Sequence, residues 1–245
     1  MDMKKIITCA ALLAGIVFFN GRLNAQVESD IVGYTTIEIT NQWTLLGVPF
    51  TTLGTAEESI DLNALFANAT NLVDGDQIQV PDGKNGYDLA YWNSSVGAWC
   101  NDGNDTLTSL KATRGRGVWL KASQASKTMP VTITAIGQVV LNRAADNLGT
   151  GYTIFSPALP MEGANLNDPS FTWTGLTDGD QIQVPDGTNG YDLAYWNSSV
   201  GAWCNDGNNI KTSLTFTAGG ACWIMSKGSN PTVTFAYKSA SDVTE

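Results

Sequence analysis

The sequence DGDQIQVPDGKNGYDLAYWNSSVGAWCNDGN at residues 74–104 occurs again at residues 178–208, as DGDQIQVPDGTNGYDLAYWNSSVGAWCNDGN. We call this segment the repeated block. Its two copies are identical at 30 of 31 positions, and Lys84 against Thr188 is the one difference. The offset is a constant 104 residues. A fixed period of this kind indicates that one structural unit is used twice.

Weaker similarity continues on both sides of the repeated block. The segment GRGVWL at residues 115–120 corresponds to GGACWI at 219–224, and WTLLG at 43–47 corresponds to YTIFS at 152–156. Apart from its beginning, the whole chain is therefore read as two copies. We predict a signal peptide at residues 1–25, a first β-module at 26–134 and a second β-module at 135–245.

Short segments rich in β-branched and aromatic residues alternate with turns rich in Gly, Asn and Asp. The strands predicted in the first copy are residues 34–40, 77–80, 87–92, 118–122 and 131–136, with hairpin turns at 82–86 and 94–97. This spacing favours an all-β fold made of two tandem homologous β-sandwich or barrel-like modules. At most one short helix is expected in each. In the first copy, Thr55 and Glu58 fit a capping box for a helix that would end near Ala67.

The first 25 residues have the pattern of a secretory signal. Lys4 and Lys5 give a basic start, an apolar run follows from Ile6 to Phe19, and Ala25 ends a small-residue cleavage site. The apolar run is short for a transmembrane helix. We therefore expect an exported protein in the periplasm, at the cell surface or outside the cell, with no membrane span in the mature chain.

The chain is acidic, with 13 Lys and Arg against 23 Asp and Glu and a net charge of −10. Removing residues 1–25 takes away three basic residues and one acidic residue, which leaves 10 against 22 and a charge of −12. Such a charge disfavours nucleic acid and anionic membrane as partners. The chain also has no histidine. That excludes Ser-His-Asp and Cys-His catalysis and His-ligated zinc.

Paired aspartates in the repeated block suggest calcium as the one candidate cofactor. Carboxylate and amide oxygens at short spacing around glycines are typical of hard-cation loops. The same residues are also typical of tight turns, where Asp and Asn bond their own backbone. Both readings remain open for Asp74, Asp76, Asp82 and Asp88 and for their equivalents Asp178, Asp180, Asp186 and Asp192.

Aromatic residues in the repeated block are candidate ligand contacts. Rings beside Asn and Asp on a β-surface can stack on sugars while amides bond the hydroxyls. Strand alternation places Tyr87 and Tyr91 on one face and Trp92 on the other, and one of these faces must be core. Ligand contact and core packing therefore both remain open for Tyr87, Tyr91, Trp92 and Trp99 and for Tyr191, Tyr195, Trp196 and Trp203.

Three cysteines follow the predicted signal peptide, namely Cys100, Cys204 and Cys222. An odd number in an exported protein leaves at least one thiol free or paired with another chain. We expect a Cys204–Cys222 disulfide, because Cys222 is peculiar to the second copy and Val118 stands at the equivalent position. Three buried, unreactive thiols are the alternative.

Five motifs in order carry a resemblance to known proteins. They are WTLLGVP at residues 43–49, DGDQI at 74–78, a Tyr…Trp-Asn…Gly-x-Trp hairpin that ends at Trp99, GRGVWL at 115–120 and VTITAIG at 131–137. The combination, present twice, resembles duplicated exported proteins of unknown function from verrucomicrobial, lentisphaeral and planctomycetal bacteria. The resemblance implies exported β-rich modules of the surface or envelope, and it supplies no catalytic residues.

These observations predict a non-catalytic binding or structural protein of the cell envelope or surface, with a glycan or an envelope protein as partner. Three alternatives are kept. The first is a carbohydrate-binding module that uses the aromatics of the repeated block. The second is a calcium-stabilised adhesion or matrix module. The third, and least favoured, is a glycoside hydrolase, since that chemistry needs a pair of tuned carboxylates.

Overall fold

The computed structural model describes residues 32–39, 43–55, 57–101, 104–123, 130–140, 146–158, 163–188, 190–205, 208–228 and 230–235. Over these residues the protein is all-β, as predicted, with 17 strands and one helix of four residues. No described helix is long and apolar enough to cross a membrane. The predicted signal peptide lies outside the described residues.

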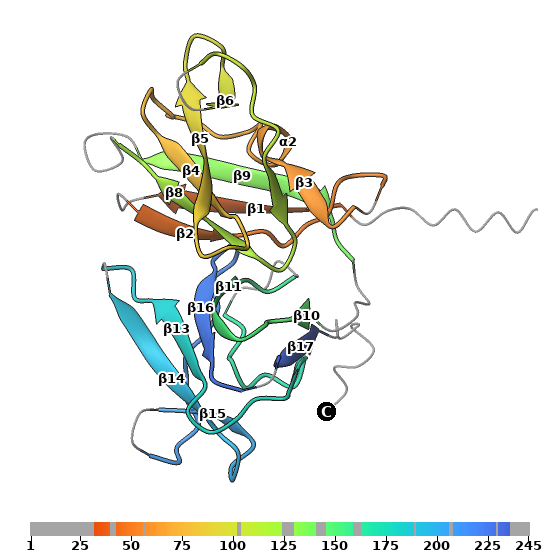
Figure 1. Ribbon diagram of the computed structural model, residues 1–245, viewed down its shortest axis with the longest axis vertical. Coiled ribbons are helices and arrows are strands. Elements are labelled where there is room, and N and C mark those ends of the chain that lie inside the picture. Colours follow the sequence, from red (N-terminus) through yellow and green to blue (C-terminus); the bar gives the residue numbers. More distant parts are fainter. Residues whose placement is uncertain are drawn as a thin grey trace, which may run out of the picture.

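Two five-stranded antiparallel sheets dominate the fold (Figure 1). The first sheet has the order β2-β8-β4-β5-β6, where the strands are β2 (Trp43–Gly47), β8 (Gly117–Lys121), β4 (Gln77–Pro81), β5 (Tyr87–Asn93) and β6 (Ala98–Asn101). The second sheet has the equivalent order β11-β16-β13-β14-β15, made of β11 (Gly151–Phe155), β16 (Cys222–Ser226), β13 (Gln181–Pro185), β14 (Tyr191–Asn197) and β15 (Ala202–Cys204).

The repeated block explains why the two sheets agree, because it supplies three neighbouring strands of each. Gln77 lies opposite Tyr91 in the first sheet, as Gln181 lies opposite Tyr195 in the second. The hairpin turns predicted at residues 82–86 and 94–97 connect β4 to β5 and β5 to β6. Equal turns and equal alternation therefore give equal register.

Each large sheet buries one face and leaves the other partly accessible. Ile78, Ala90 and Leu120 lie in the core of the first sheet, and the equivalent Ile182 and Ala194 lie in the core of the second. The opposite faces carry half-buried glutamines, tyrosines and tryptophans. Strand alternation thus separates an apolar inner face from an outer face with binding-type side chains.

Smaller sheets complete each half. β1 (Val32–Ile39) pairs along its whole length with β9 (Val131–Gln138). In the second half, β17 (Thr232–Phe235) lies between β10 (Asp146–Asn147) and β12 (Phe171–Thr174). The boundary predicted between residues 134 and 135 falls inside β9, so the backbone passes through it without a linker. The division into two separately folding modules stays a prediction.

The predicted helix is shorter than expected, and its capping box is wrong. The chain forms β3 (Ser59–Asp61), which pairs with β7 (Lys111–Thr113), and only Leu62–Leu65 are helical, as α2. Asp61 caps this turn by accepting hydrogen bonds from the Asn63 and Ala64 amides. Pairing with β7 therefore overrides the local helix signal that begins at Thr55.

Candidate functional site

Two of the predicted ligand-contacting aromatics lie in the core. Trp99 and Trp203 are both 0% exposed. Trp92 and Trp196 pack edge-on against them with ring centroids 5.5 Å apart. A fully buried ring cannot contact a ligand, so the ligand-contact prediction is wrong for Trp99 and Trp203. Their burial follows from strand alternation, which directs this face of the sheet inward.

The tyrosines of the repeated block lie on the outer face instead. Tyr87 and Tyr191 are 38% and 39% exposed. Tyr91 and Tyr195 lie on the same faces and are half-buried. Because these rings remain accessible, they are the part of the predicted aromatic set that can meet a ligand.

The aspartates of the repeated block bond the backbone around them. The Asp82 carboxylate accepts hydrogen bonds from the Lys84 and Gly86 amides, at 2.6 and 2.9 Å, and these bonds hold its pKa below the usual value. Asp74 accepts a bond from the Ser94 amide at 2.7 Å, which lowers its pKa in the same way. Asp186 and Asp178 repeat these arrangements in the second sheet.

The remaining aspartates occupy two contrasting environments. Asp76 and Asp180 are fully buried and accept bonds from loop amides, while Asp88 and Asp192 are exposed on the central hairpins. No group of three or more Cys, Asp or Glu side chains among the described residues is arranged to hold a metal ion. The bonds that are present match the turn reading of these residues, and calcium stays a prediction.

The predicted Cys204–Cys222 disulfide is not formed. All three described cysteines are free and buried. Cys204 lies on β15 and Cys222 on β16, and β14 and β13 separate these strands in the sheet. Three strand spacings amount to about 14 Å, twice the distance that a disulfide can span. Burial also raises the pKa of the Cys222 thiol, which makes it unreactive.

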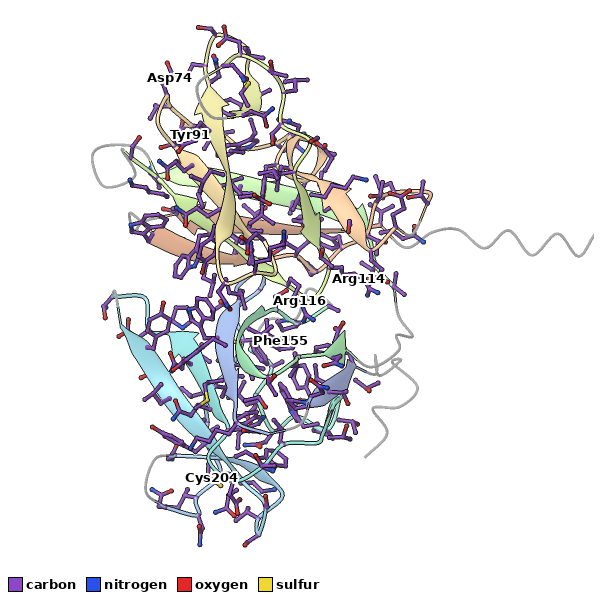
Figure 2. All side chains as sticks on the ribbon, viewed as in Figure 1. Asp74, Tyr91, Arg114, Arg116, Phe155 and Cys204 are labelled. Atoms are coloured by element: carbon purple, nitrogen blue, oxygen red, sulfur yellow. The ribbon has the colours of Figure 1, made fainter. Side chains whose placement is uncertain are left out.

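The two large sheets meet at a junction between β2 and β8 on one side and β11 and β16 on the other. Backbone bridges join Leu46 to Gly220 and Arg116 to Phe155. Under the repeat, Leu46 corresponds to Phe155 and Gly220 to Arg116, so the two bridges are equivalent. Figure 2 shows Arg116 and Phe155 at this junction. The contact thus has the reciprocal form of a two-fold dimer interface, made here within one chain.

Glycines allow the backbones to approach closely at the junction. A Cβ atom on Gly117 would lie 2.4 Å from Ile154 Cγ2 and 2.7 Å from Ala221 Cβ. A Cβ atom on Gly47 would lie 2.5 Å from the Gly220 carbonyl oxygen. Leu45, Ile154 and Ala221 fill the remaining space as a small buried cluster. Any larger side chain at either glycine would push the sheets apart.

A row of four aromatic rings crosses the junction. Trp43 contacts Trp119 edge-on at 6.1 Å, Trp119 contacts Trp223 at 6.5 Å, and Tyr152 contacts Trp223 edge-on at 6.1 Å. The outermost rings are the most accessible, with Trp43 40% and Tyr152 63% exposed. The row therefore presents rings from both sheets along one path.

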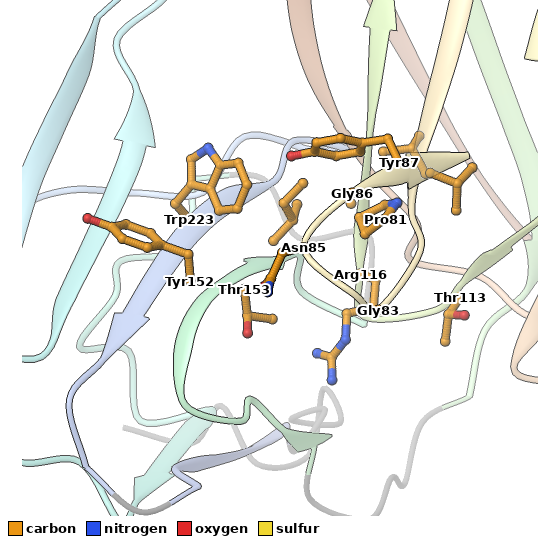
Figure 3. A pocket seen from close by; sticks show the side chains of 14 residues that line it. Pro81, Gly83, Asn85, Gly86, Tyr87, Thr113, Arg116, Tyr152, Thr153 and Trp223 are labelled. Carbon is orange, nitrogen blue, oxygen red and sulfur yellow. The ribbon is translucent and has the colours of Figure 1, made fainter. Parts of the chain in front are cut away.

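A cleft of about 520 Å³, the first cleft, opens between the β4–β5 hairpin and the second sheet. The hairpin contributes Asn85 and Tyr87, and the second sheet contributes Tyr152 and Trp223. In Figure 3 the three rings lie above and to the left of Asn85, and the Arg116 side chain points downward, away from the Tyr87 and Trp223 rings. Asn85 has φ 70°, a left-handed conformation that Asn tolerates in turns.

An equivalent cleft of about 670 Å³, the second cleft, uses the opposite combination. The β13–β14 hairpin contributes Tyr191, and the first sheet contributes Trp43 and Trp119. Each cleft thus combines the hairpin of one repeated block with the aromatic pair of the other sheet.

Sequence reasoning missed half of each cleft. Trp43, Trp119, Tyr152, Trp223 and Arg116 lie outside the repeated block. The correspondence of Trp119 with Trp223 was visible in the repeat, but it gave no indication that each would face the other copy's hairpin. That information lies in the packing of the two sheets.

Comparison of this chain with protein-family models, with curated proteins and with solved structures found no match. The resemblance to duplicated envelope proteins stays a prediction. The function is therefore argued from the geometry of the two clefts.

Proposed function

We propose that this protein is a non-catalytic carbohydrate-binding protein of the cell surface or periplasm, which holds saccharide chains in its two junction clefts. The observation that carries the proposal is that each repeated hairpin faces an accessible pair of rings from the other sheet. Flat aromatic rings combined with a few polar groups suit the faces and the hydroxyls of a sugar.

The amide and hydroxyl groups of the first cleft support a saccharide ligand. Asn85 lines the first cleft together with Tyr87 and Trp223, and Thr113 lies on the side away from Trp223 (Figure 3). An amide can donate to and accept from sugar hydroxyls at the same time. The rings bind the apolar face of a pyranose while these groups bond its edges.

The acidic groups of the clefts favour binding over hydrolysis. The described lining of the first cleft contains no carboxylate, whereas glycoside hydrolysis needs two. The second cleft has Glu38 and Asp186. Backbone bonds from Thr188 and Gly190 lower the pKa of Asp186, so this carboxyl is ionised and cannot serve as the proton donor.

Because the chain has two clefts, each cleft can bind a saccharide weakly while the protein holds a long polymer firmly. Two clefts at one junction bind a long polymer with a high effective local concentration at the second cleft. The export signal predicted at residues 1–25 and the acidic mature chain are consistent with work outside the cytoplasm. This location is part of the proposal.

A glycan array followed by titration of tryptophan fluorescence tests the proposal. Binding of a glycan should change the emission of Trp119 or Trp223, because both rings line a cleft. Tyr152→Ala should weaken binding at the first cleft, and Trp43→Ala should weaken it at the second. Exposed Leu107, which lines neither cleft, provides the control substitution Leu107→Ala. An array without any bound glycan would refute the proposed function.

A further inference from the structure

We infer that the two clefts differ in ligand charge, and that the first cleft selects an anionic sugar whose carboxylate or sulfate ester pairs with Arg116. This inference rests on the proposed function, since it names the class of saccharide that the first cleft takes. It starts from an asymmetry between two sites that are otherwise equivalent.

The two clefts carry opposite charges. Arg116 is the single charged side chain among the described residues that line the first cleft. The second cleft has Glu38 and Asp186 and no basic residue in its described lining. Gly220 occupies the position equivalent to Arg116, so the cation is peculiar to the first cleft. An anionic ligand is therefore attracted to one cleft and repelled by the other.

Arg116 has unused hydrogen-bonding capacity. Its Nη2 donates to the Asn147 carbonyl at 2.7 Å and its Nη1 donates to the Gly115 carbonyl at 3.5 Å. A guanidinium has five N–H donors, so three remain. Both partners are neutral carbonyls, which fix the side chain without neutralising it. A half-buried guanidinium held in this way is pre-organised for a carboxylate or a sulfate.

Three other cations of the described chain have partners. Arg114 pairs with Glu58 at 2.7 Å, Lys111 lies 3.8 Å from Glu57, and Lys121 lies over the Trp43 ring. No ion pair joins Arg116 to a carboxylate among the described residues. Of the two described arginines, Arg116 is thus the one without a carboxylate partner.

The one difference within the repeated block, Lys84 against Thr188, also makes the surroundings of the first cleft more positive than those of the second. Lys84 is exposed in the hairpin that borders the first cleft, and Thr188 replaces it beside the second. Lys84 adds positive potential near the first cleft without lining it. The clefts thus differ by Arg116 against Gly220 and by Lys84 against Thr188, and both differences favour an anion at the first cleft.

Matched pairs of saccharides test the inference in the intact protein. Oligogalacturonate is compared with its methyl ester, and a sulfated galactose oligomer with its desulfated form, by calorimetric titration at low salt. We expect at least one anionic form to bind about tenfold more tightly than its neutral partner. The preference should shrink in high salt. The two pairs distinguish a carboxylate ligand from a sulfate ester.

Three variants assign the preference to Arg116. Arg116→Gln should abolish the tenfold difference, and Arg116→Lys should retain part of it, because it keeps the charge and loses the planar fork. Lys111→Gln makes the same change of charge outside both clefts and should leave the preference intact. Melting temperatures of all three variants show whether the fold is preserved.

The outcomes separate this inference from the proposed function. Equal affinity for the anionic and neutral forms, or a preference that survives in Arg116→Gln, would overturn the inference and leave carbohydrate binding intact. If no saccharide of either kind binds and the glycan array is also empty, the proposed function fails, and the inference fails with it.

Discussion

Each half has a five-stranded sheet with the same strand order, but the hydrophobic cores that pack against the two sheets differ. In the first half the core beside β3 and β7 is formed by Ile60 opposite Ala112. In the second half the equivalent residues are Ala164 and Phe216, so the large and small side chains have changed places. The second core is also richer in aromatic rings, with Phe155, Phe171, Trp173, Phe216 and Phe235. Cores tolerate such exchanges when the total volume is kept.

This difference shows which positions determine the architecture. The repeated block sets strand register and turn geometry, and it is nearly invariant between the halves. The residues around it fill the core and set the charge of the clefts, and they have diverged. The predictions that follow alter equivalent residues in the two halves, so that each half acts as the control for the other.

The largest expected effect is the loss of a buried indole. Trp99→Ala and Trp203→Ala should each destabilise the protein by about 4 kcal/mol, because each removes a fully buried ring. Trp203 also contacts Trp173 edge-on at 5.4 Å, so its loss should cost about 1 kcal/mol more. Urea denaturation measures both values. Equal losses would show that the aromatic filling of the second core adds nothing to this pair.

The next largest loss of stability is expected on substitution of the two buried aspartates, Asp76 and Asp180. Asp76 accepts bonds from the Val73 amide and from the amide and hydroxyl of Ser123, while Asp180 accepts from the Thr177 and Lys227 amides and the Thr177 hydroxyl. An asparagine at either position replaces one carboxylate oxygen with an NH2 group. That group donates hydrogen bonds and would face the N–H and O–H donors that now bond the carboxylate. We expect a loss of about 3 kcal/mol in each half.

Denaturation of Asp76→Asn and Asp180→Asn checks this prediction, with exposed Asp88→Asn as the control. The control should change the free energy of unfolding by less than about 0.5 kcal/mol. A loss as small as the control's would mean that the loops at Ser123 and Lys227 do not depend on these carboxylates.

An ion pair found in the first half alone gives a smaller effect. Arg114 is buried, whereas the Glu58 side chain is 52% exposed, and Ala218 stands at the position equivalent to Arg114. Glu58→Ala should cost about 2 kcal/mol, because it leaves a buried guanidinium without its carboxylate. Arg114→Met should cost less, since the remaining carboxylate can turn to solvent. If the order is reversed, packing of the Arg114 stem dominates over its charge.

Much of the architecture could be predicted from the repeated block. Alternation of Ile78 and Val80 with glutamines fixes the buried face, and the glycine-rich turns fix the hairpins. The junction could not be predicted, because Gly47 and Gly117 read as ordinary strand glycines until the opposing backbone is known. The helix begins later than predicted for a related reason: Ser59–Asp61 pair with a strand about 50 residues away, and local propensity carries no trace of that partner.

The sequence predicted Tyr87 and Tyr191 as ligand contacts, but it did not predict that they line clefts between the two sheets. Tyr87 and Tyr191 were predicted as ligand contacts together with Trp99 and Trp203, since spacing alone cannot say which sheet face is covered. The missing residues, such as Tyr152 and Arg116, come from segments where the copies differ. Duplicated proteins with nearly identical blocks can therefore carry specificity in the parts that have diverged.

The smallest predicted effect concerns acid stability and the single difference within the repeated block. Bonds from the Lys84 and Gly86 amides, with the Lys84 charge as a lesser cause, hold the pKa of Asp82 below its usual value. Thr188 supplies no such charge to Asp186, whose pKa is lowered by the Thr188 and Gly190 amides and by the Thr188 side chain. A depressed pKa in the folded state stabilises the protein above the unfolded value, near pH 4. That stability is lost as the pH falls through the folded pKa.

The substitution Lys84→Met removes the charge without adding the hydroxyl group that Thr188 places beside Asp186, and so isolates the charge. We expect it to raise the pKa of Asp82 slightly and to leave that of Asp186 unchanged, as measured by NMR titration of the carboxyl carbons. Because both carboxylates are exposed, added salt should reproduce the shift in the unsubstituted protein. If the pKa of Asp82 is the same with and without this substitution, the Lys84 charge has no electrostatic consequence for its own hairpin. Its effect would then have to be sought at the neighbouring first cleft, where the same substitution should weaken binding of an anionic sugar.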